Sequence, residues 1–284
     1  MNILKLFFTL CVIYDLNFES MRNNKIFLFA IVLFSLISTT SIYSANTCFQ
    51  PGEVLIYDVS FLGIKLGTIK LESVEITDLN NTKTYYAKSY INSNPDIPFV
   101  SLHSIFNSWM DPSLAFSYQF VGQTQLSDNL WDYNRIAFDY QNNKILNKHW
   151  YGDSLVTDDK FDYKGKINDG CSLLFFARQY VDLKKTVYVP TFIDGPYSTK
   201  LNFIGTRENI KIDAISYPVR TVYFDGKADW KGIYGLTGKF EGWFSDDEAH
   251  IPIKALMNVY VGKIVIELKS WERKGWKAPQ AKSK

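Results

Sequence analysis

The sequence predicts an all-β protein with one short helix, folded as a curved, barrel-like antiparallel meander. Apolar and polar side chains alternate within a series of short runs, and this alternation has the period of a half-buried strand. Turn-forming residues separate the runs at intervals of about ten residues, as in other all-β folds. The 284 residues include 18 Tyr and 21 Phe, residue types that favour a pleated sheet. About ten to thirteen strands are too many for one flat open sheet, so we expect the sheet to curl.

The first three predicted strands form an antiparallel meander. Residues 53–61 place apolar side chains on one face and polar ones on the other. A turn at Gly63 leads to a second strand over 64–76, and the asparagine pair at 80–81 separates it from a third over 84–91.

The middle of the chain contains one clear hairpin. Residues 133–140 and 144–151 flank Gln141-Asn142-Asn143, and Asn tolerates the left-handed backbone that tight hairpins need. Residues 99–110 fit either a helix or a bent strand, because their apolar side chains have helical spacing. The polar, aspartate-rich segment 152–170 is expected to be a loop or a weakly structured hairpin tip.

One amphipathic helix is predicted over 171–180. Asn168 and Asp169 precede it and offer side chains that can cap its first turn. Beyond the helix, short apolar runs separated by turn residues predict further strands over 186–193, 198–204, 210–214, 219–224, 238–244, 251–260 and 263–271.

Residues 1–45 form a leader with the order of a secretory signal peptide. A basic segment at 21–25 precedes an apolar run over 26–37 and then small and polar residues up to Ala45. The run is shorter than the about 20 residues of a membrane-spanning helix, which favours cleavage near Ser44 or Ala45. Two interpretations of the first twenty residues stay open: Met21 is the true start, or the signal peptide has a long N-terminal region before its apolar run.

The remaining chain is predicted to be a single β-rich domain over 46–274, followed by a disordered basic tail over 275–284. Export would place it in the periplasm or outside the cell, with no transmembrane span in its mature form. An outer-membrane barrel is the competing interpretation, but charged residues within the predicted strands and a Lys-rich C-terminus favour a soluble protein. The net charge of +2, without a basic stripe, argues against nucleic acid as a partner.

Three segments of the chain have a distinctive residue order. They are Gln50-Pro51-Gly52-Glu53 with Tyr57-Asp58-Val59, then Asn168-Asp169-Gly170-Cys171-Ser172, and finally Gly242-Trp243-Phe244-Ser245-Asp246-Asp247 with His250-Ile251-Pro252-Ile253 and Val261-Gly262-Lys263-Ile264. Together they resemble the bacterial DUF3108 family of exported proteins, over most of 50–271. The resemblance implies a predominantly β, barrel-like envelope protein of unassigned role, and it brings no catalytic residues with it.

Weak candidates for a ligand site are Trp243, Asp246, Asp247 and Arg178. Adjacent carboxylates such as Asp246 and Asp247 can bind a cation or share a proton, but Asp also caps tight turns through its own backbone. The second interpretation is favoured because consecutive strand residues point to opposite faces. Trp243 fits the core better than a ligand platform. Arg178 either holds an anionic ligand or pairs within the fold, and the pairing is favoured.

Cys48 and Cys171 remain after removal of the leader, and an exported pair can form a disulfide. Two reduced thiols are at least equally compatible with the sequence. The three His residues are far apart and lack the spacing of a zinc site, and no motif for a cofactor or nucleophile is present. We therefore expect no metal, no cofactor and no enzymatic activity.

Three functions are compatible with this pattern. The first is a carrier that binds an apolar ligand, such as a lipid or glycolipid, inside the curved sheet. The second is a structural or assembly factor that binds envelope proteins or glycan through an exposed aromatic patch. The third, a hydrolase using Asp246 and Asp247, requires their carboxylates to converge in a cleft.

Overall fold

The computed structural model describes residues 47–97, 101–232, 237–259 and 262–281. These residues belong to one compact unit, Asn46–Lys284. The predicted leader over 1–45, including Met21 and the cleavage region, lies outside the described residues.

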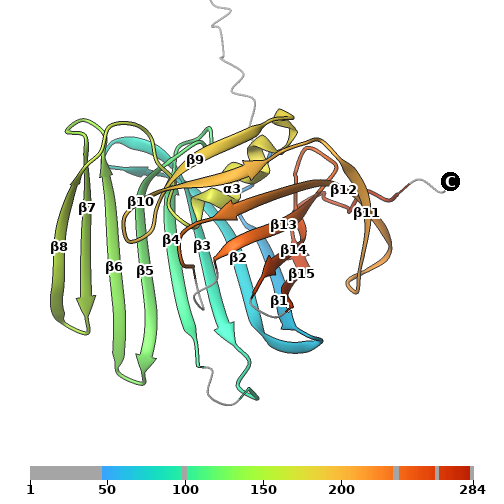
Figure 1. The fold of residues 1–284 in the computed structure, drawn as a ribbon, viewed down its shortest axis with the longest axis horizontal. Coiled ribbons are helices and arrows are strands. Elements are labelled where there is room, and N and C mark those ends of the chain that lie inside the picture. Colours follow the sequence, from blue (N-terminus) through green and yellow to red (C-terminus); the bar gives the residue numbers. More distant parts are fainter. Residues whose placement is uncertain (1–46, 98–100, 233–236, 260–261, 282–284) are drawn as a thin grey trace, which may run out of the picture. The chain divides into compact units, whose positions relative to one another are not determined.

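The first eight strands form the predicted antiparallel meander, in which each strand pairs with the next (Figure 1). Residues 99–110, which fitted either a helix or a strand, contain a strand. The expectation of a loop over 152–170 was wrong for its first half. That half is an edge strand solvated on both faces, so it shows no apolar alternation. The strands are β1 Glu53–Phe61, β2 Ile64–Leu79, β3 Thr82–Ser93, β4 His103–Met110, β5 Ser117–Ser127, β6 Leu130–Asp139, β7 Lys144–Tyr151 and β8 Ser154–Asp162.

The second half of the chain extends the same sheet from its other side. The last strand returns to pair with β1, so the order across the sheet is β8-β7-β6-β5-β4-β3-β2-β1-β15-β14-β13-β12-β10-β9, with β11 paired to β12. Strand β1 is therefore central, and β8 and β9 are the two edges. The strands of this half are β9 Thr186–Phe192, β10 Pro196–Asn202, β11 Arg207–Ile212, β12 Ile215–Ala228, β13 Gly238–Ser245, β14 Pro252–Asn258 and β15 Lys263–Glu272.

The sheet curls until its two ends meet, which confirms the predicted barrel-like architecture. The rings of Phe161 on β8 and Phe192 on β9 lie 5.2 Å apart between centroids. Asn168, just beyond β8, bonds to β9: its backbone N–H donates to Pro190 O at 2.9 Å, and its carbonyl accepts from Phe192 N at 2.7 Å. The closure therefore combines side-chain packing with a short stretch of backbone pairing.

The only α-helix among the described residues, α3 (Ser172–Tyr180), lies at the upper end of the strands in Figure 1. The predicted cap is confirmed for Asp169: its Oδ1 accepts from the backbone N–H groups of Cys171 at 2.7 Å and Ser172 at 2.8 Å. Its Oδ2 accepts from Ser108 Oγ of β4 at 2.6 Å. Asp169 thus fixes both the start of the helix and its position on the sheet. A one-turn 3₁₀ helix, η1 (Val181–Leu183), follows.

The prediction of a disordered tail over 275–284 was wrong for residues 275–281. Arg220 N donates to Pro279 O at 2.8 Å, and Ala281 N donates to Pro218 O at 2.9 Å, so the tail runs along the start of β12. Ala278 is buried. The basic composition predicted a solvated tail, but backbone groups of the tail form hydrogen bonds with β12.

A buried ion pair joins distant parts of the chain behind the helix. Arg178 of α3 is fully buried, and its Nη1 donates to Glu53 Oε1 on β1 at 2.8 Å. The same guanidinium donates to the carbonyl oxygens of Ala249 at 3.0 Å and His250 at 3.1 Å. Arg273, just after β15, donates to the other carboxylate oxygen, Glu53 Oε2. One carboxylate therefore ties together the beginning, middle and end of the domain.

Replacing Glu53→Gln is expected to destabilise the fold by about 3–5 kcal/mol, because it leaves the buried Arg178 charge without its counter-ion. Urea unfolding followed by Trp fluorescence measures the change. The matched control is Asp58→Asn, which breaks the half-exposed pair with Lys65 and should cost less than about 1 kcal/mol. Equal losses in the two variants would contradict the central role of Glu53.

The same ion pair predicts a direction for the pH dependence of stability. Burial pushes the pKa of Glu53 upward, but Arg178 and Arg273 outweigh it and hold that pKa below its ordinary value. Since the folded-state pKa is depressed, the stabilisation is present above the unfolded pKa of about 4.3 and is lost as the pH falls through the folded value. The free energy of unfolding of the Glu53→Gln variant should not show this loss as the pH falls.

Candidate functional site

The curled sheet encloses a cavity of about 910 Å³. Packed protein interiors contain few voids larger than a water molecule, whereas ligand pockets range from about 300 to 1,000 Å³. Most of the lining is apolar: Tyr57, Val59, Leu66, Ile69, Leu71, Ile91, Phe106, Phe120, Ile136, Leu174, Phe192, Ile193, Trp230, Pro252, Ala255, Met257, Ile264 and Ile266. The interior is therefore not filled by its own side chains.

The cavity is bounded at one end by the helix and along its length by strands. Cys171, just before α3, and Leu174 of α3 line it at the upper end, near Phe192 and Ile193. Strands β1–β6 and β14–β15 form the walls. The segment 230–232 contributes a further part of the lining. The Arg178–Glu53 pair joins this helix to β1, so it also holds the end wall in place.

Several positions along the cavity wall carry small residues. Gly67, Ser89, Gly122 and Ala255 all line the cavity where a packed core would need large side chains. A Cβ added to Gly122 would lie 3.3 Å from the ring of Phe106 on the neighbouring strand. Backbone pairing is continuous through Ser89 and Gly122, whereas Gly67 and Ala255 lie next to register shifts in the β1–β2 and β13–β14 pairs.

Polar lining residues gather toward the end of the cavity opposite α3. Asn92, near the end of β3, contacts His103 Nδ1 through its Oδ1, and Thr124 Oγ1 of β5 lies 2.9 Å from Ser104 Oγ. Asp132, near the start of β6, pairs with a histidine of β7. The cavity is thus apolar at the helix end and carries a belt of hydrogen-bonded polar groups at the other.

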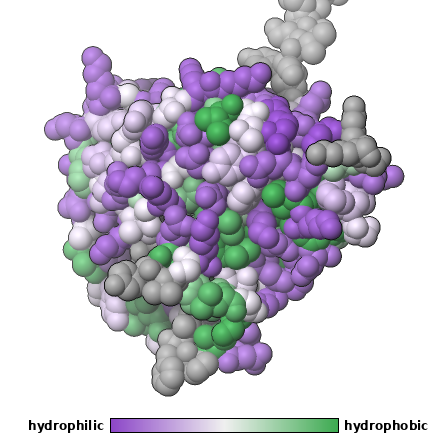
Figure 2. Space-filling model, turned by 45° about the vertical axis from the view of Figure 1, so that its right-hand side comes forward, coloured by the Kyte–Doolittle hydropathy of each residue, from purple (hydrophilic) through white to green (hydrophobic). Residues whose placement is uncertain are grey.

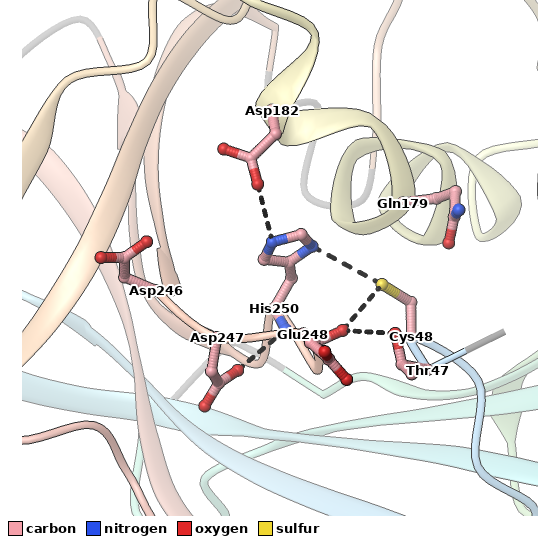
Figure 3. Close-up of a pocket in the computed structure, with 8 residues that line it drawn as sticks. All are labelled: Thr47, Cys48, Gln179, Asp182, Asp246, Asp247, Glu248 and His250. Atoms are coloured by element: carbon pink, nitrogen blue, oxygen red, sulfur yellow. Dashed lines mark hydrogen bonds and ion pairs between the residues drawn. The ribbon is translucent and has the colours of Figure 1, made fainter.

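A second, smaller pocket of about 430 Å³ lies at the surface beside α3 (Figure 3). Three of its side chains lie in a row that resembles a nucleophile, a base and an orienting acid. Cys48 Sγ is 3.6 Å from His250 Nδ1, and His250 Nε2 is 3.3 Å from Asp182 Oδ2. The remaining lining residues are Thr47, Gln179, Asp246, Asp247 and Glu248.

The geometry of this row does not activate the thiol. His250 Nδ1 lies 2.7 Å from the carbonyl oxygen of Arg178, and a carbonyl only accepts, so Nδ1 carries a proton and cannot take one from Cys48. Burial raises the pKa of the Cys48 thiol, despite the nearby Arg178 and Arg273. A reactive cysteine needs the opposite shift. The row holds the turn before β14 against α3.

A comparison with protein-family models adds the family. The model of DUF3108, described as a protein of unknown function, matches residues 56–269. The chain belongs to the DUF3108 family. The match begins within β1 and ends within β15, so it includes every strand and the helix of the described domain. A comparison with curated proteins finds no match.

The fold of this DUF3108 chain also occurs in a solved structure. The crystal structure of a beta-barrel-like protein of the domain of unknown function DUF1849, from Brucella abortus, matches with a TM-score of 0.53 and 12% sequence identity. The match covers 79% of this chain and 98% of that chain. At this level of identity, the likeness shows the fold alone.

The structure separates Asp246 from Asp247. The carboxylate of Asp246 accepts from Arg220 Nε at 2.8 Å and Arg207 Nε at 3.2 Å. The carboxylate of Asp247 accepts from the backbone N–H of Ala249 at 3.0 Å and caps the turn. Figure 3 shows the two carboxylates pointing away from each other. They do not converge, and the requirement of the hydrolase hypothesis is not met.

The other two candidates also lie outside the large cavity. Trp243 is buried under β11, where its Nε1 donates to Glu208 Oε2 at 2.6 Å and its ring contacts Tyr223. Arg178 is held by Glu53 and two carbonyl oxygens, so the favoured interpretation of pairing within the fold matches its contacts. The cavity residues were not predicted. Glycine, serine and alanine at inward strand positions were the signal for them.

Cys48 and Cys171 are not joined in the structure. The thiol of Cys48 lies 3.5 Å from the carbonyl oxygen of Arg178, whereas Cys171 lines the large cavity. Of the two states that the sequence left open, the structure contains the two separate thiols, which have different neighbours at the two ends of α3.

The described ranges contain neither a membrane-spanning helix nor a cluster of metal-binding side chains. No helix there is both long and apolar enough to cross a membrane. The same residues contain no cluster of three or more His, Cys, Asp or Glu side chains suited to a metal ion.

Asp169→Ala is expected to destabilise the domain by about 1–2 kcal/mol, because the first turn of α3 loses its cap and Ser108 loses its acceptor. Thermal unfolding followed by circular dichroism measures this change. Asp162→Ala serves as the control, since Asp162 is an exposed partner of Lys144. A control variant that unfolds as early as Asp169→Ala would show that the cap does not position the helix.

Proposed function

We propose that this DUF3108 protein is an exported, non-enzymatic envelope protein that binds an apolar or amphiphilic ligand inside its curled sheet. The hollow of about 910 Å³ carries the proposal, because its size is that of a ligand pocket and its lining is mainly aliphatic and aromatic. An empty apolar cavity costs stability through lost dispersion contacts, and an apolar occupant restores those contacts.

The distribution of polar groups supports a lipid-like ligand over a pure hydrocarbon. An alkyl chain fits the apolar region near α3, which is lined by Leu71, Ile136, Leu174 and Phe192. Polar atoms of a ligand would then lie beside the belt at the opposite end. A molecule with an alkyl chain and a polar head group matches both the apolar region and the polar belt.

The alternative of an assembly factor has less support in the structure. It requires an exposed aromatic patch, but only two aromatic residues are among the large exposed apolar side chains that the structure describes, Tyr151 and Tyr188. They lie on β7 and β9, which are different parts of the sheet.

Filling the cavity with Ala255→Phe is expected to weaken binding of a fluorescent fatty acid by about tenfold or more, a loss of about 1.4 kcal/mol. Ala255 faces the interior from β14, and a phenyl ring there occupies space that an alkyl chain would use. Titration followed by fluorescence measures the affinity. Native mass spectrometry of the protein purified from cells tests for a co-purified amphiphile.

Leu256→Phe is the matched control, since the neighbouring residue on a strand points to the opposite face. It should leave fatty-acid affinity unchanged. Unchanged affinity in both variants, together with no amphiphile in the native mass spectrum, would rule out the interior as the binding site.

A further inference from the structure

Exposed apolar side chains gather at one end of the sheet. Strands β1, β3, β5 and β7 run in the same direction, so the turns that follow them lie at the same end, opposite α3. Figure 2 shows apolar side chains at the lower edge of the molecule in that view. Of the ten large apolar side chains that are exposed in the described residues, six lie in or next to these turns: Leu62, Ile64, Leu126, Tyr151, Leu155 and Val156. We call these six residues the rim.

Leu62 is the most unusual member of the rim. Its backbone φ is +49°, in the left-handed region, and its side chain is 71% exposed. A bulky residue in this conformation is strained, and tight hairpins normally place Asn or Gly there. The turn between β2 and β3, at the other end of the sheet, follows that rule with Asn80 and Asn81, whose φ angles are +50° and +62°. Leu62 therefore costs stability and exposes apolar surface without contributing to the core.

The rim is continuous with the polar end of the cavity. Ile64 begins β2, and Leu66 and Gly67, only two and three residues later, already line the cavity. Leu126 follows the lining residue Thr124 at the end of β5. A ligand that leaves the cavity at this end meets the rim first.

The Lys side chains near the rim are paired, and the turns that carry it add two carboxylates, Asp128 and Asp153, but no Lys or Arg. Lys65 Nζ lies 2.7 Å from Asp58 Oδ1, and Lys263 Nζ lies 3.0 Å from Glu241 Oε2. The apolar side chains therefore stand beside paired charges and a few carboxylates, without the free cations that attract anionic lipids. This matches an uncharged or zwitterionic partner, and it disfavours one recognised by electrostatic attraction.

We propose that the rim docks on a lipid surface, with the apolar side chains inserted among the head groups and the cavity end facing the membrane. Three separate hairpin tips contribute to the rim, and a fluid lipid surface accommodates separate tips without needing a matching rigid shape. The proposal deepens the proposed function and rests on it, since docking lets an amphiphile pass between bilayer and cavity without crossing water.

The test compares vesicle binding by the exported protein and a triple rim variant, Leu62→Asn, Ile64→Thr and Leu126→Asn. Co-sedimentation with phosphatidylcholine vesicles should fall by at least about tenfold in the variant, because three insertable side chains are lost. Leu62→Asn supplies a better turn residue, so the thermal midpoint of that single variant should not fall. Loss of vesicle binding with an unchanged or higher midpoint separates docking from misfolding.

Tyr188→Asn with Ile204→Asn is the matched control, because these side chains are comparably exposed but lie in and near β9 and β10. Its vesicle binding should equal that of the unchanged protein. Equal losses in control and rim variants, or no vesicle binding at all, would overturn the proposal. Binding that requires phosphatidylglycerol and disappears in 0.5 M salt, where the Debye length is only about 4–5 Å, would overturn it too.

Fatty-acid titration in the absence of vesicles separates this proposal from the proposed function. The rim variant should keep its fatty-acid affinity, and Ala255→Phe should keep its vesicle binding. Vesicle binding without any fatty-acid binding would contradict the proposed carrier function and support only membrane association. Fatty-acid binding without vesicle binding would remove the docking surface alone.

Discussion

The carboxylate of Glu53 is the point on which the arrangement of the domain depends. It lies on the central strand β1, and it holds Arg178 of the helix and Arg273 after the last strand. Both guanidinium groups are largely removed from water, so neither has a solvated alternative. The pair places α3 across one end of the curled sheet, with Leu174 of the same helix toward the hollow. A charged interaction thus supports the end wall of an apolar cavity.

The strands could be predicted because their signal is local. The alternation of apolar and polar residues predicted β1, the hairpin of β6 and β7, and most strands after the helix. Asp169 predicted where the helix begins. Strand β8 was missed because backbone pairing with β7 stabilises it while its side chains remain largely solvated. The tail was missed because its backbone pairs with β12 and its Trp276 and Ala278 pack on a core formed by distant residues. The ends of the sheet meet through contacts between distant residues, which no local pattern encodes.

The sequence led to the hypothesis of a hollow inside a curved sheet, but it did not identify the residues that line it. A curved sheet enclosing an apolar ligand was the favoured hypothesis, but the residues singled out were the polar and aromatic ones around Trp243 and Asp246. These are held by Glu208, Arg207 and Arg220. Two signals carried more information. Glu53 shares the apolar face of β1, which demands a buried partner, and Gly122 faces the interior where bulk is expected.

The closure of the sheet has a consequence for what the interior can accept. Its edges β8 and β9 meet through Phe161, Phe192 and the short stretch around Asn168, and not through a full ladder between the two edges. Separating these two edges exposes a few aromatic rings but breaks few backbone hydrogen bonds. Opening a fully closed barrel would instead break a whole ladder of them. The circumference of the curled sheet can therefore change at a modest cost in free energy. Under the proposed function, ligands of differing width would share one scaffold, with selectivity set by their length and by the chemistry of one end.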